Sequence, residues 1–486
     1  MTDIRKTQER VLLGLLRKAE QTLLGKQYHF PDIKNYDDFK GNIPVRTYDS
    51  LKPVIEKVKS GESDVLWPGE MRNFAVSSGT TGVGKHLPLR KERLQSDRRF
   101  MRKLIRRFLI QWPEPQIWFG KQASLPGSIE LVMKGDRNLI MGEISGFTAR
   151  YAPRWLTPFQ VVSPQELCLM DWKEKFDICL HQAIKNDVRV ISAVPSWTLI
   201  FLQEALKTSA KDSIDELWPN LRLIVSGGAA LRNYRQSIES LCSPLNLQFM
   251  ESYGASEGYF AFTRQIDKPD LQLVIDNGIF YEWVPFEPDL LEEVLSKRAI
   301  PSWKVKTGVD YIMLVTTNSG LWRYPVNDII RFTNIKPLSI EVRGRVSEML
   351  DVYGEAVHFS ELETALERVQ NNNLTEYKGL IATAHPPTAT SPPSHVWIIK
   401  WDTPNNAQNF ESEIATAMDQ ALISVNRHYA IRRESGALGK PLVIFLPDRD
   451  GDLSANPKKK EAQTKPLRII SYDNLPEWIK SRIETR

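Results

Sequence analysis

Between about residue 70 and residue 330, short β-rich runs alternate with longer amphipathic stretches, and this alternation constrains the fold more than any other feature of the chain. Strands are expected at residues 73–76, 116–119, 188–191 and 221–225. Helices long enough to cross over a sheet are expected at residues 90–109, 163–186 and 196–207. Because parallel strands need such crossovers, the pattern predicts an α/β fold.

After about residue 340 the order of elements changes, which indicates a second, smaller unit. Strands are expected at residues 339–342, 378–383, 395–401 and 441–446, and helices from Ser360 onward and over residues 406–429. This mixture is typical of an α+β unit. We therefore expect a large domain over residues 1–343 and a small domain over residues 344–486, with a hinge near residues 343–350.

Composition excludes several classes of protein. Hydrophobic residues make up 42% of the chain and charged residues 25%, which is typical of a folded protein rather than a disordered or fibrous one. No uncharged apolar run approaches the roughly 20 residues of a membrane-spanning helix. Residues 1–26 are amphipathic and do not resemble a secretion signal. We expect a cytoplasmic protein with no membrane contact.

Charge and cysteine content exclude further partners. The net charge of +5 is mild, and the basic clusters at residues 90–107 and 458–460 are not interleaved with aromatic side chains, so no nucleic-acid partner is expected. Cys168, Cys179 and Cys242 are odd in number and widely spaced. We expect them to be small buried hydrophobic residues rather than part of a disulfide framework or a zinc site.

The loop of residues 77–85, Ser-Ser-Gly-Thr-Thr-Gly-Val-Gly-Lys, can bind phosphate. Its glycines let the backbone approach an anion, its hydroxyl and N–H groups can donate to the anion, and Lys85 offsets part of the charge. A flexible surface turn is the alternative. Residues 79–85 also fit most of the P-loop pattern, but His86 stands where that pattern requires the Ser or Thr that binds magnesium, so the P-loop interpretation fails.

Two acidic residues stand in turns with a chemistry that suits a nucleotide. Glu257, within the segment 251–258, can bind Mg²⁺ together with ATP phosphates and water, although an exposed acid in a turn is the alternative. Asp328 follows Asn327, and its two carboxylate oxygens can accept both hydroxyls of a ribose. An Asp in this position is equally common as simple turn chemistry.

Taken in order, these segments and residues 343–350 resemble the acyl acid amido synthetases of the Gretchen Hagen family, known from auxin-responsive plant genes, within the adenylate-forming superfamily. The resemblance covers nearly the whole chain and is to the family's bacterial members. It extends to residues 45–55, 193–197, 226–228 and 280–285. It implies a large adenylate-forming domain with mixed β-sheets and covering helices, followed by a smaller mobile α+β domain.

The resemblance also implies the residues of the site. Those implied to bind ATP are Ser77, Ser78, Gly79, Thr80, Thr81, Tyr253, Gly254, Ala255, Ser256, Glu257, Phe280, Asp328, Arg331 and Lys465. Among them Glu257 would hold Mg²⁺, Phe280 would pack against the nucleotide and Asp328 would bind the ribose. The implied catalytic residues are Lys465, Glu257 and Thr80, and Arg345 and Glu348 would belong to the hinge.

The ribose segment departs from the family's pattern at two positions. Pro325 stands where the family has arginine, and Asn327 stands where it has glycine. Because Asn tolerates a positive φ better than most residues, the turn can persist. Arg323 or Arg331 would have to supply the missing positive charge. Near the C-terminus, residues 463–468 resemble the family's Gln-x-Lys-x-Pro-Arg segment. Pro466 departs from that segment, because it directly follows Lys465.

The function implied by the resemblance is ATP- and Mg²⁺-dependent activation of a carboxylic acid as an acyl-adenylate, followed by amide formation with an amino acid or another amine, by a monomer. One alternative is transfer to a thiol such as coenzyme A, and another is a non-catalytic relative that binds nucleotide or acid. The acid itself is not defined by the sequence. The tryptophans considered for its pocket or for the core are Trp112, Trp118, Trp155 and Trp197. Arg102 and Arg106 are expected on a solvated helix face, and contact of one of them with a second anionic group on the acid is the alternative.

Overall fold

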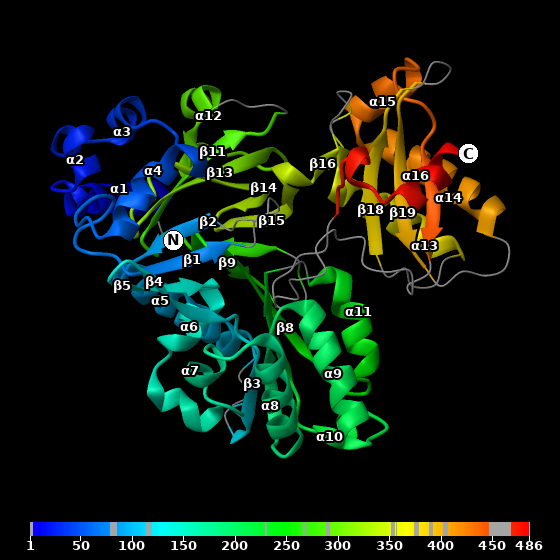
Figure 1. Ribbon diagram of the computed structural model, residues 1–486, viewed down its shortest axis with the longest axis horizontal. Helices are drawn as coiled ribbons and strands as arrows, with labels where there is room; N and C mark the ends of the chain where they lie inside the picture. The colour runs from blue at the N-terminus through cyan, green and yellow to red at the C-terminus, as the bar shows by residue number, and fades with distance from the viewer. Residues whose placement is uncertain are drawn as a thin grey trace.

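The structure is a computed structural model, and it describes residues 3–77, 85–112, 117, 119–228, 231–265, 268, 270–287, 292–350, 355, 357–373, 379–387, 392–401, 407–446 and 468–485. A large unit built on two sheets lies beside a smaller unit that has its own three-stranded sheet (Figure 1). The α/β fold with a large N-terminal part and a smaller C-terminal part is confirmed.

An 11-stranded sheet forms the centre of the large unit. In spatial order its strands are β12 (Ile300–Pro301), β11 (Ile279–Pro285), β13 (Asp310–Thr317), β14 (Tyr324–Ile335), β15 (Leu338–Arg345), β10 (Leu271–Leu273), β9 (Gly258–Thr263), β8 (Gln248–Ala255), β7 (Leu223–Gly227), β6 (Val188–Ser192) and β3 (Lys121–Ser124). Strands β3, β6, β7 and β8 are parallel to one another. The expectation of parallel strands is therefore confirmed.

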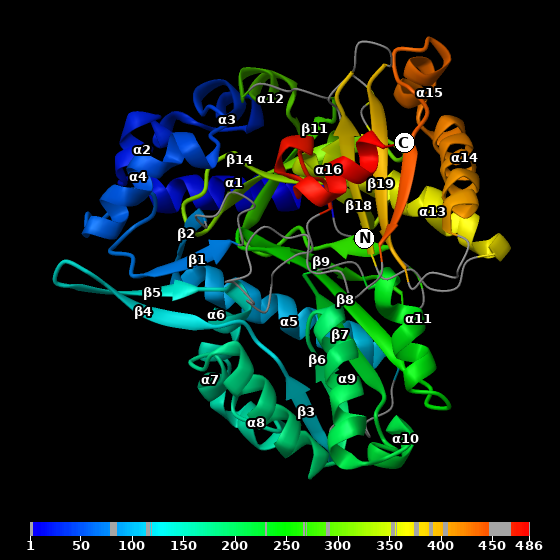
Figure 2. The same cartoon turned by 45° about the vertical axis from the view of Figure 1, so that its right-hand side comes forward.

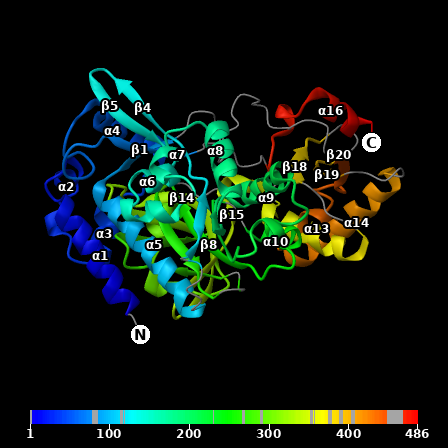
Figure 3. The same ribbon diagram turned by 90° about the horizontal axis from the view of Figure 1, so that it is seen from below.

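Helices cover both faces of the parallel strands (Figure 3). One face packs against α5 (Lys91–Gln111), α6 (Ile144–Arg150) and α7 (Pro164–Leu167), and the other against α8 (Trp172–Ile184), α9 (Pro195–Ser209), α10 (Ile214–Leu217) and α11 (Arg232–Leu241). Because side chains alternate along a strand, Ala123, Ile191 and Ile224 pack towards α8 and α9. Their strand neighbours point to the opposite face.

Two local expectations for this part of the chain were wrong. The helix expected over residues 163–186 is two helices, α7 and α8, because the Asp171 side chain accepts a hydrogen bond from the Glu174 N–H at 2.9 Å and starts a new helix. Ile117 and Phe119, the described residues of the strand expected at 116–119, lie in no strand. The edge strand β3 begins at Lys121 instead.

A second sheet and the N-terminal helices complete the large unit. Its strands, in spatial order, are β2 (Lys85–Leu89), β1 (Asn73–Ser77), β5 (Arg137–Gly142) and β4 (Ile129–Lys134). The helices are α1 (Ile4–Ala19), α2 (Leu23–Gln27), α3 (Tyr36–Asn42), α4 (Tyr48–Ser60) and, between β11 and β12 in the chain, α12 (Glu292–Arg298). The β4–β5 hairpin projects from the body of the molecule (Figure 2).

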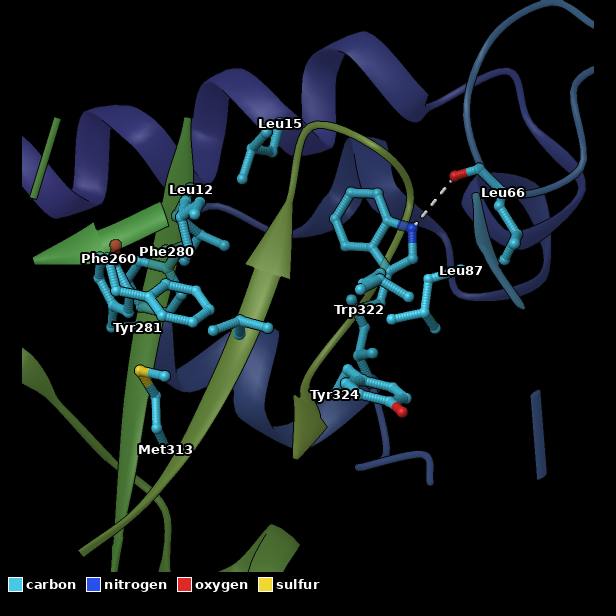
Figure 4. Packing of buried hydrophobic residues seen from close by; sticks show 14 of the residues in the cluster. Leu12, Leu15, Leu66, Leu87, Phe260, Phe280, Tyr281, Met313, Trp322 and Tyr324 are labelled. Carbon is cyan, nitrogen blue, oxygen red and sulfur yellow. Dashed lines mark hydrogen bonds between the residues drawn. The ribbon is translucent and has the colours of Figure 1, made fainter. Parts of the chain in front are cut away.

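The largest core joins α1 to the antiparallel half of the 11-stranded sheet. Leu12 and Leu15 pack with Tyr281 and Met313, and the indole N–H of Trp322 donates to the Leu66 carbonyl oxygen at 3.2 Å (Figure 4). Gln8 is fully buried and donates to the carbonyl of Ile279, so it fixes α1 against β11. This core supports the strands β14 and β15, which carry Asp328 and Arg345.

The small unit is a three-stranded sheet between two helical layers. Its strands are β18 (Gly379–His385), β19 (Ser394–Lys400) and β20 (Leu442–Leu446), preceded by the short pair β16 (Met349–Leu350) and β17 (Val357–His358). Its helices are α13 (Phe359–Asn373), α14 (Ala407–Val425), α15 (Arg427–Glu434) and α16 (Glu477–Glu484). Helices α13 and α14 cover one face and α16 covers the other. The helix expected over 406–429 is broken at Asn426, which accepts from the Tyr429 N–H.

The three cysteines are buried, as expected. Cys168, Cys179 and Cys242 are buried and unpaired, and burial raises the pKa of Cys179 and of Cys242 to about 12. Within the ranges described above, no helix combines the length and the apolar character needed to cross a bilayer.

Candidate active site

A cavity of about 1100 Å³ lies on one face of the parallel strands. Its floor consists of side chains and backbone at alternate positions of β3, β6, β7 and β8, namely Gln122, Ser124, Val190, Ser192, Leu223, Val225, Ser252 and Gly254. Its cover is formed by α5, α6 and the 3₁₀ turn η3 (Arg154–Phe159), through Met101, Leu104, Phe108, Ala149 and Leu156. A site at the carboxyl ends of parallel strands is common in α/β proteins.

Asp328 lies at one end of this cavity, in a bulge of β14. The register between β13 and β14 shifts at this point, and Asn327 has a φ of 62°. The prediction that Asn327 preserves a turn with positive φ is therefore confirmed. Asp328 is 5% exposed, and its carboxylate accepts a hydrogen bond from the Tyr253 hydroxyl at 2.7 Å. Arg345 Nε lies 3.3 Å from its other oxygen.

The positive charge beside Asp328 comes from Arg345. It does not come from Arg323 or Arg331, as the sequence had led us to expect. Arg323 is fully buried and pairs with Glu282 at 2.9 Å, so it cannot reach Asp328. Arg345 instead lies directly across from Asp328 in the β14–β15 register. Its guanidinium therefore balances the carboxylate from a neighbouring strand rather than from the missing position in the motif.

Glu257 lies in the turn between β8 and β9 and also lines the cavity. Burial raises the pKa of its carboxyl to about 7, and the charge of Asp328 adds to this shift. Arg93 Nη1, from α5, donates to the Glu257 carbonyl oxygen and fixes the turn. A cation beside Glu257 would favour its ionised form, so this residue fits a Mg²⁺ site completed by phosphate oxygens and water.

The flanks of the expected phosphate loop lie at the same end of the cavity. Ser77 ends β1 and its Cα is paired with that of Lys85 at the start of β2. Lys85 and His86 line the cavity, and the Lys85 ammonium lies 5.8 Å from the centroid of the Tyr48 ring. The predicted site residues Ser78, Gly79, Thr80, Thr81 and Lys465 lie outside the described residues.

A polar branch of the cavity continues from Lys85 towards α4. Lys59 Nζ lies 2.7 Å from His86 Nδ1 and 3.0 Å from the Glu56 carboxylate. Lys52 and Asp49 line the same branch. The positively charged residues that line the cavity therefore lie on α4, β2 and β15, at the end of the cavity that contains Asp328 and Glu257. We call this end the nucleotide end, after the prediction for these two residues.

Several predicted site residues meet at the cavity, whereas Phe280 and Arg331 lie away from it. The predicted residues that line it are Gly254, Ala255, Ser256, Glu257, Asp328 and Arg345, and Tyr253 reaches Asp328 from the core. The prediction that Phe280 packs against the nucleotide is corrected. Phe280 is fully buried in the core against Tyr36 and does not line the cavity. Arg331 also lies elsewhere, because its guanidinium forms two hydrogen bonds with Asp310 at 2.7 and 2.6 Å.

Glu348 lies away from the cavity, and the tryptophans differ in whether they line it. Glu348 lies in the 3₁₀ turn η5 (Val346–Glu348) and pairs with Arg468 at 3.4 Å. Trp197 lines the cavity, whereas Trp155 is 68% exposed. Arg102 and Arg106 are exposed on α5 and do not line the cavity, as expected. Trp118 lies outside the described residues.

The fold is that of acyl acid amido synthetases. The chain resembles the solved AtGH3.15 acyl acid amido synthetase in complex with 2,4-DB, with a TM-score of 0.80 at 17% identity over 100% of this chain and 94% of that one. It also resembles 2-hydroxyisobutyryl-CoA ligase in its postadenylation state, with a TM-score of 0.65 at 11% identity over 99% and 92% of the two chains.

Sequence comparison defines the family. The GH3 family N-terminal, central and C-terminal domains match residues 1–207, 272–345 and 360–473 in that order. The chain is 25% identical to indole-3-acetic acid-amido synthetase GH3.2 of Arabidopsis thaliana, over 89% of this chain and 92% of that protein. It is 23% identical to the probable indole-3-acetic acid-amido synthetase GH3.2 of Oryza sativa, over 81% and 74%. The chain belongs to the GH3 family.

Proposed function

We propose that this protein is an ATP-dependent ligase that activates a carboxylic acid as an acyl-adenylate and then forms an amide with an amino acid or another amine. One observation carries the proposal. Two buried carboxylates suited to a nucleotide, Asp328 and Glu257, lie at one end of a cavity whose middle section is lined largely by apolar side chains. Such a cavity can hold a nucleotide and an organic acid together.

In the first step a carboxylate oxygen of the acid attacks the α-phosphorus of ATP, and the bond to the β-phosphate oxygen breaks. Pyrophosphate leaves with the electron pair, and the product is a mixed anhydride of the acid and AMP. In the second step the amine nitrogen attacks the acyl carbon and AMP leaves. The nitrogen loses its proton, and an amide remains.

The residues of this chain bind and orient the substrates. Asp328 accepts hydrogen bonds from the ribose hydroxyls while Tyr253 and Arg345 hold its carboxylate in place. Glu257 would bind Mg²⁺, which supplies positive charge to the phosphates when it is bound. Thr80 with its neighbours in residues 77–81 would donate to the phosphates, and Lys465 would approach the α-phosphate, as the family resemblance implies.

Amine transfer is favoured over thiol transfer because relatives of this chain are amido synthetases. The Arabidopsis relative is an indole-3-acetic acid-amido synthetase, so its acceptor is an amine. The same proposal takes this chain to be a cytoplasmic monomer of the family's bacterial type.

The first test is acid-dependent exchange of labelled pyrophosphate into ATP, measured with purified protein, Mg²⁺ and a panel of aromatic, indolic and aliphatic acids. We expect exchange with a subset of acids. Lys465→Ala should lower this exchange, and Glu257→Gln should lower it and raise the Mg²⁺ concentration that gives half-maximal rate. The matched control is Glu130→Gln on the exposed side of β4, which should leave the rate unchanged.

Each outcome has a clear meaning. A protein that binds ATP but exchanges pyrophosphate with no acid contradicts the proposal and favours the non-catalytic alternative. If exchange occurs, product masses measured with amino acids and with coenzyme A identify the acceptor. A product with coenzyme A alone would contradict the amide step and leave the adenylation step intact.

A further inference from the structure

The cavity floor runs across the strands rather than along them. Ser124 on β3 pairs with Ser192 on β6, and Ser192 pairs with Val225 on β7. β7 in turn pairs with β8, where Gly227 lies opposite Ser252. The floor therefore crosses three strand spacings from the nucleotide end at β8 to the far end at β3. At about 4.8 Å per spacing, this distance is about 14 Å.

The middle of this path is mainly apolar. Val190, Leu223 and Val225 contribute most of the floor there. Met101, Leu104 and Phe108 of α5 cover it, while the hydroxyls of Thr148 and Tyr259 in the wall lie 3.4 Å apart and can satisfy each other. A ligand that lies across the strands therefore passes an apolar section after its carboxylate.

Three polar, uncharged side chains line the cavity at β3 and beside it. Gln122 Nε2 donates to Ser124 Oγ at 3.0 Å, Ser124 Oγ donates to Gln160 Oε1 at 3.1 Å, and Gln160 Nε2 donates to Gln122 Oε1 at 3.2 Å. All three side chains line the cavity, and Gln160 is only 8% exposed. We call these three residues the distal triad.

The distal triad keeps hydrogen-bonding capacity for a ligand. A glutamine amide nitrogen carries two hydrogens and its oxygen has two lone pairs, and each amide of the triad uses one of each in the ring. Among the described residues that line the cavity, the cations lie on α4, β2 and β15, away from β3. The triad therefore suits a neutral group rather than a second carboxylate, which would need a positive charge.

We propose that the acid activated by this protein is elongated and apolar in its middle, and that it carries one uncharged hydrogen-bonding group, such as a hydroxyl or a carbonyl, at the end far from the carboxylate. The distal triad binds that group. The carboxylate lies beside β8 with the nucleotide, and the apolar body lies over β7 and β6. This inference rests on the proposed adenylation and defines its substrate class.

The test compares straight-chain acids with their ω-hydroxy derivatives in the pyrophosphate exchange assay. Octanoic, decanoic, dodecanoic and hexadecanoic acids and the ω-hydroxy derivative of each are the probes. For chains long enough to reach β3, we expect kcat/KM for the hydroxy acid to exceed that for the plain acid by about tenfold, which is the effect of one hydrogen bond to a site that otherwise leaves polar groups unpaired.

Variants of the triad then show which residues produce the preference. Gln122→Leu and Gln160→Leu should bring the ratio of the two kcat/KM values close to one, mainly by lowering the value for the hydroxy acid. Gln182→Leu on the exposed side of α8 makes the same chemical change away from the cavity and should keep the wild-type ratio. If the triad has only a structural role, its variants change the unfolding temperature but not the ratio.

The result in the wild-type protein decides the inference even if a variant fails to fold. Exchange with plain and hydroxylated acids at equal efficiency, at every chain length, would overturn the substrate class and leave the proposed adenylation intact. Exchange with no acid of any kind would overturn both proposals. A preference for short aromatic acids that cannot reach β3 would also overturn the inference.

Discussion

At the scale of the residue, the carboxylate of Asp328 is held from two directions. The Tyr253 hydroxyl donates to one oxygen from the core side, and Arg345 lies beside the other from the neighbouring strand. Burial raises the pKa of Tyr253 well above its ordinary value, so the hydroxyl keeps its proton and remains a donor. The two contacts orient the carboxylate in advance, which would reduce the ordering that the proposed binding of a nucleotide requires.

The variant Tyr253→Phe removes only the hydroxyl and keeps the packing of the ring. A hydrogen bond to a charged group contributes about 1.5–3 kcal/mol, so we expect the Kd for ATP to rise roughly tenfold or more. Titration calorimetry with ATP measures this. The matched control is Tyr281→Phe, another buried tyrosine, whose hydroxyl donates to the Val274 carbonyl at 3.2 Å. An unchanged Kd in Tyr253→Phe would refute this role.

Sequence reasoning succeeded at single residues where local backbone rules apply. It predicted that Asn327 accepts a positive φ, and the structure has it at 62°. It placed Phe280 against the nucleotide, yet Phe280 packs in the core, because a motif position does not reveal which side of a strand faces the site. The partnership of Asp328 with Arg345 was not predictable by counting from the hairpin turn, because the β14–β15 register shifts twice between the turn and this pair.

At the scale of the element, α5 connects the cavity to the Glu257 turn. Arg93 and Asp97, one turn apart, form a buried ion pair with a distance of 2.8 Å between Nε and Oδ1. Both are almost completely buried, and Arg93 also donates to the Glu257 carbonyl. Further along the same helix, Met101 and Leu104 cover the cavity. One helix therefore positions the proposed metal ligand and shapes the space for the acid.

The variant Arg93→Met should destabilise the protein by about 3–5 kcal/mol, because it leaves Asp97 buried without a compensating charge. The double variant Arg93→Met, Asp97→Leu removes both charges and should cost clearly less. Unfolding in guanidinium chloride measures the difference. Equal stability of the single and double variants would show that Asp97 carries no uncompensated charge in the single variant.

Element types were predictable along much of the chain, whereas the boundaries of some elements were not. The strands β1, β6 and β7 and the helices α5 and α9 lie where short β-rich runs and amphipathic stretches predicted them. The break between α7 and α8 was missed because the apolar pattern continues through it, and only the cap at Asp171 marks the new helix. Capping depends on the backbone geometry of a few residues, which periodicity does not report.

At the scale of the whole molecule, side chains of the small unit contact the large one, and two such contacts involve described residues at the junction. Arg232 on α11 lies 3.8 Å from Glu363 on α13, and the ring of Phe286, after β11, lies 5.1 Å from that of His358 on β17. Burial lowers the pKa of His358 to about 4, with Asp310 of the large unit opposing the shift and Arg343 and Arg331 adding to it. His358 is therefore neutral at pH 7 and sensitive to the contact between the units.

Acidification should destabilise the protein through His358. The unfolded chain binds a proton at this residue near pH 6.5, whereas the folded protein does so only near pH 4. Unfolding therefore takes up a proton between these values, and the free energy of unfolding falls as pH falls through this window, by at most about 3 kcal/mol.

Denaturant midpoints at pH 7 and pH 5 measure this effect. The variant His358→Phe should lose part of the difference between the two midpoints, while His181→Gln, an exposed control on α8, should keep it. Equal pH dependence in His358→Phe and in the wild-type protein would show that other groups cause the acid sensitivity. Which surfaces of the two units meet was not predictable from the sequence, because no local pattern reports contacts such as that between Phe286 and His358.

The floor of the cavity can limit the length of the acid that binds. Parallel strands repeat at a fixed interval, so an acid bound across β8, β7, β6 and β3 as proposed would advance about 4.8 Å with each strand. A larger side chain at Val225 or Val190 would block the cavity before β3, so the acid could not reach the distal triad. A single floor position can thus set the maximum chain length, while the residues at the nucleotide end stay the same.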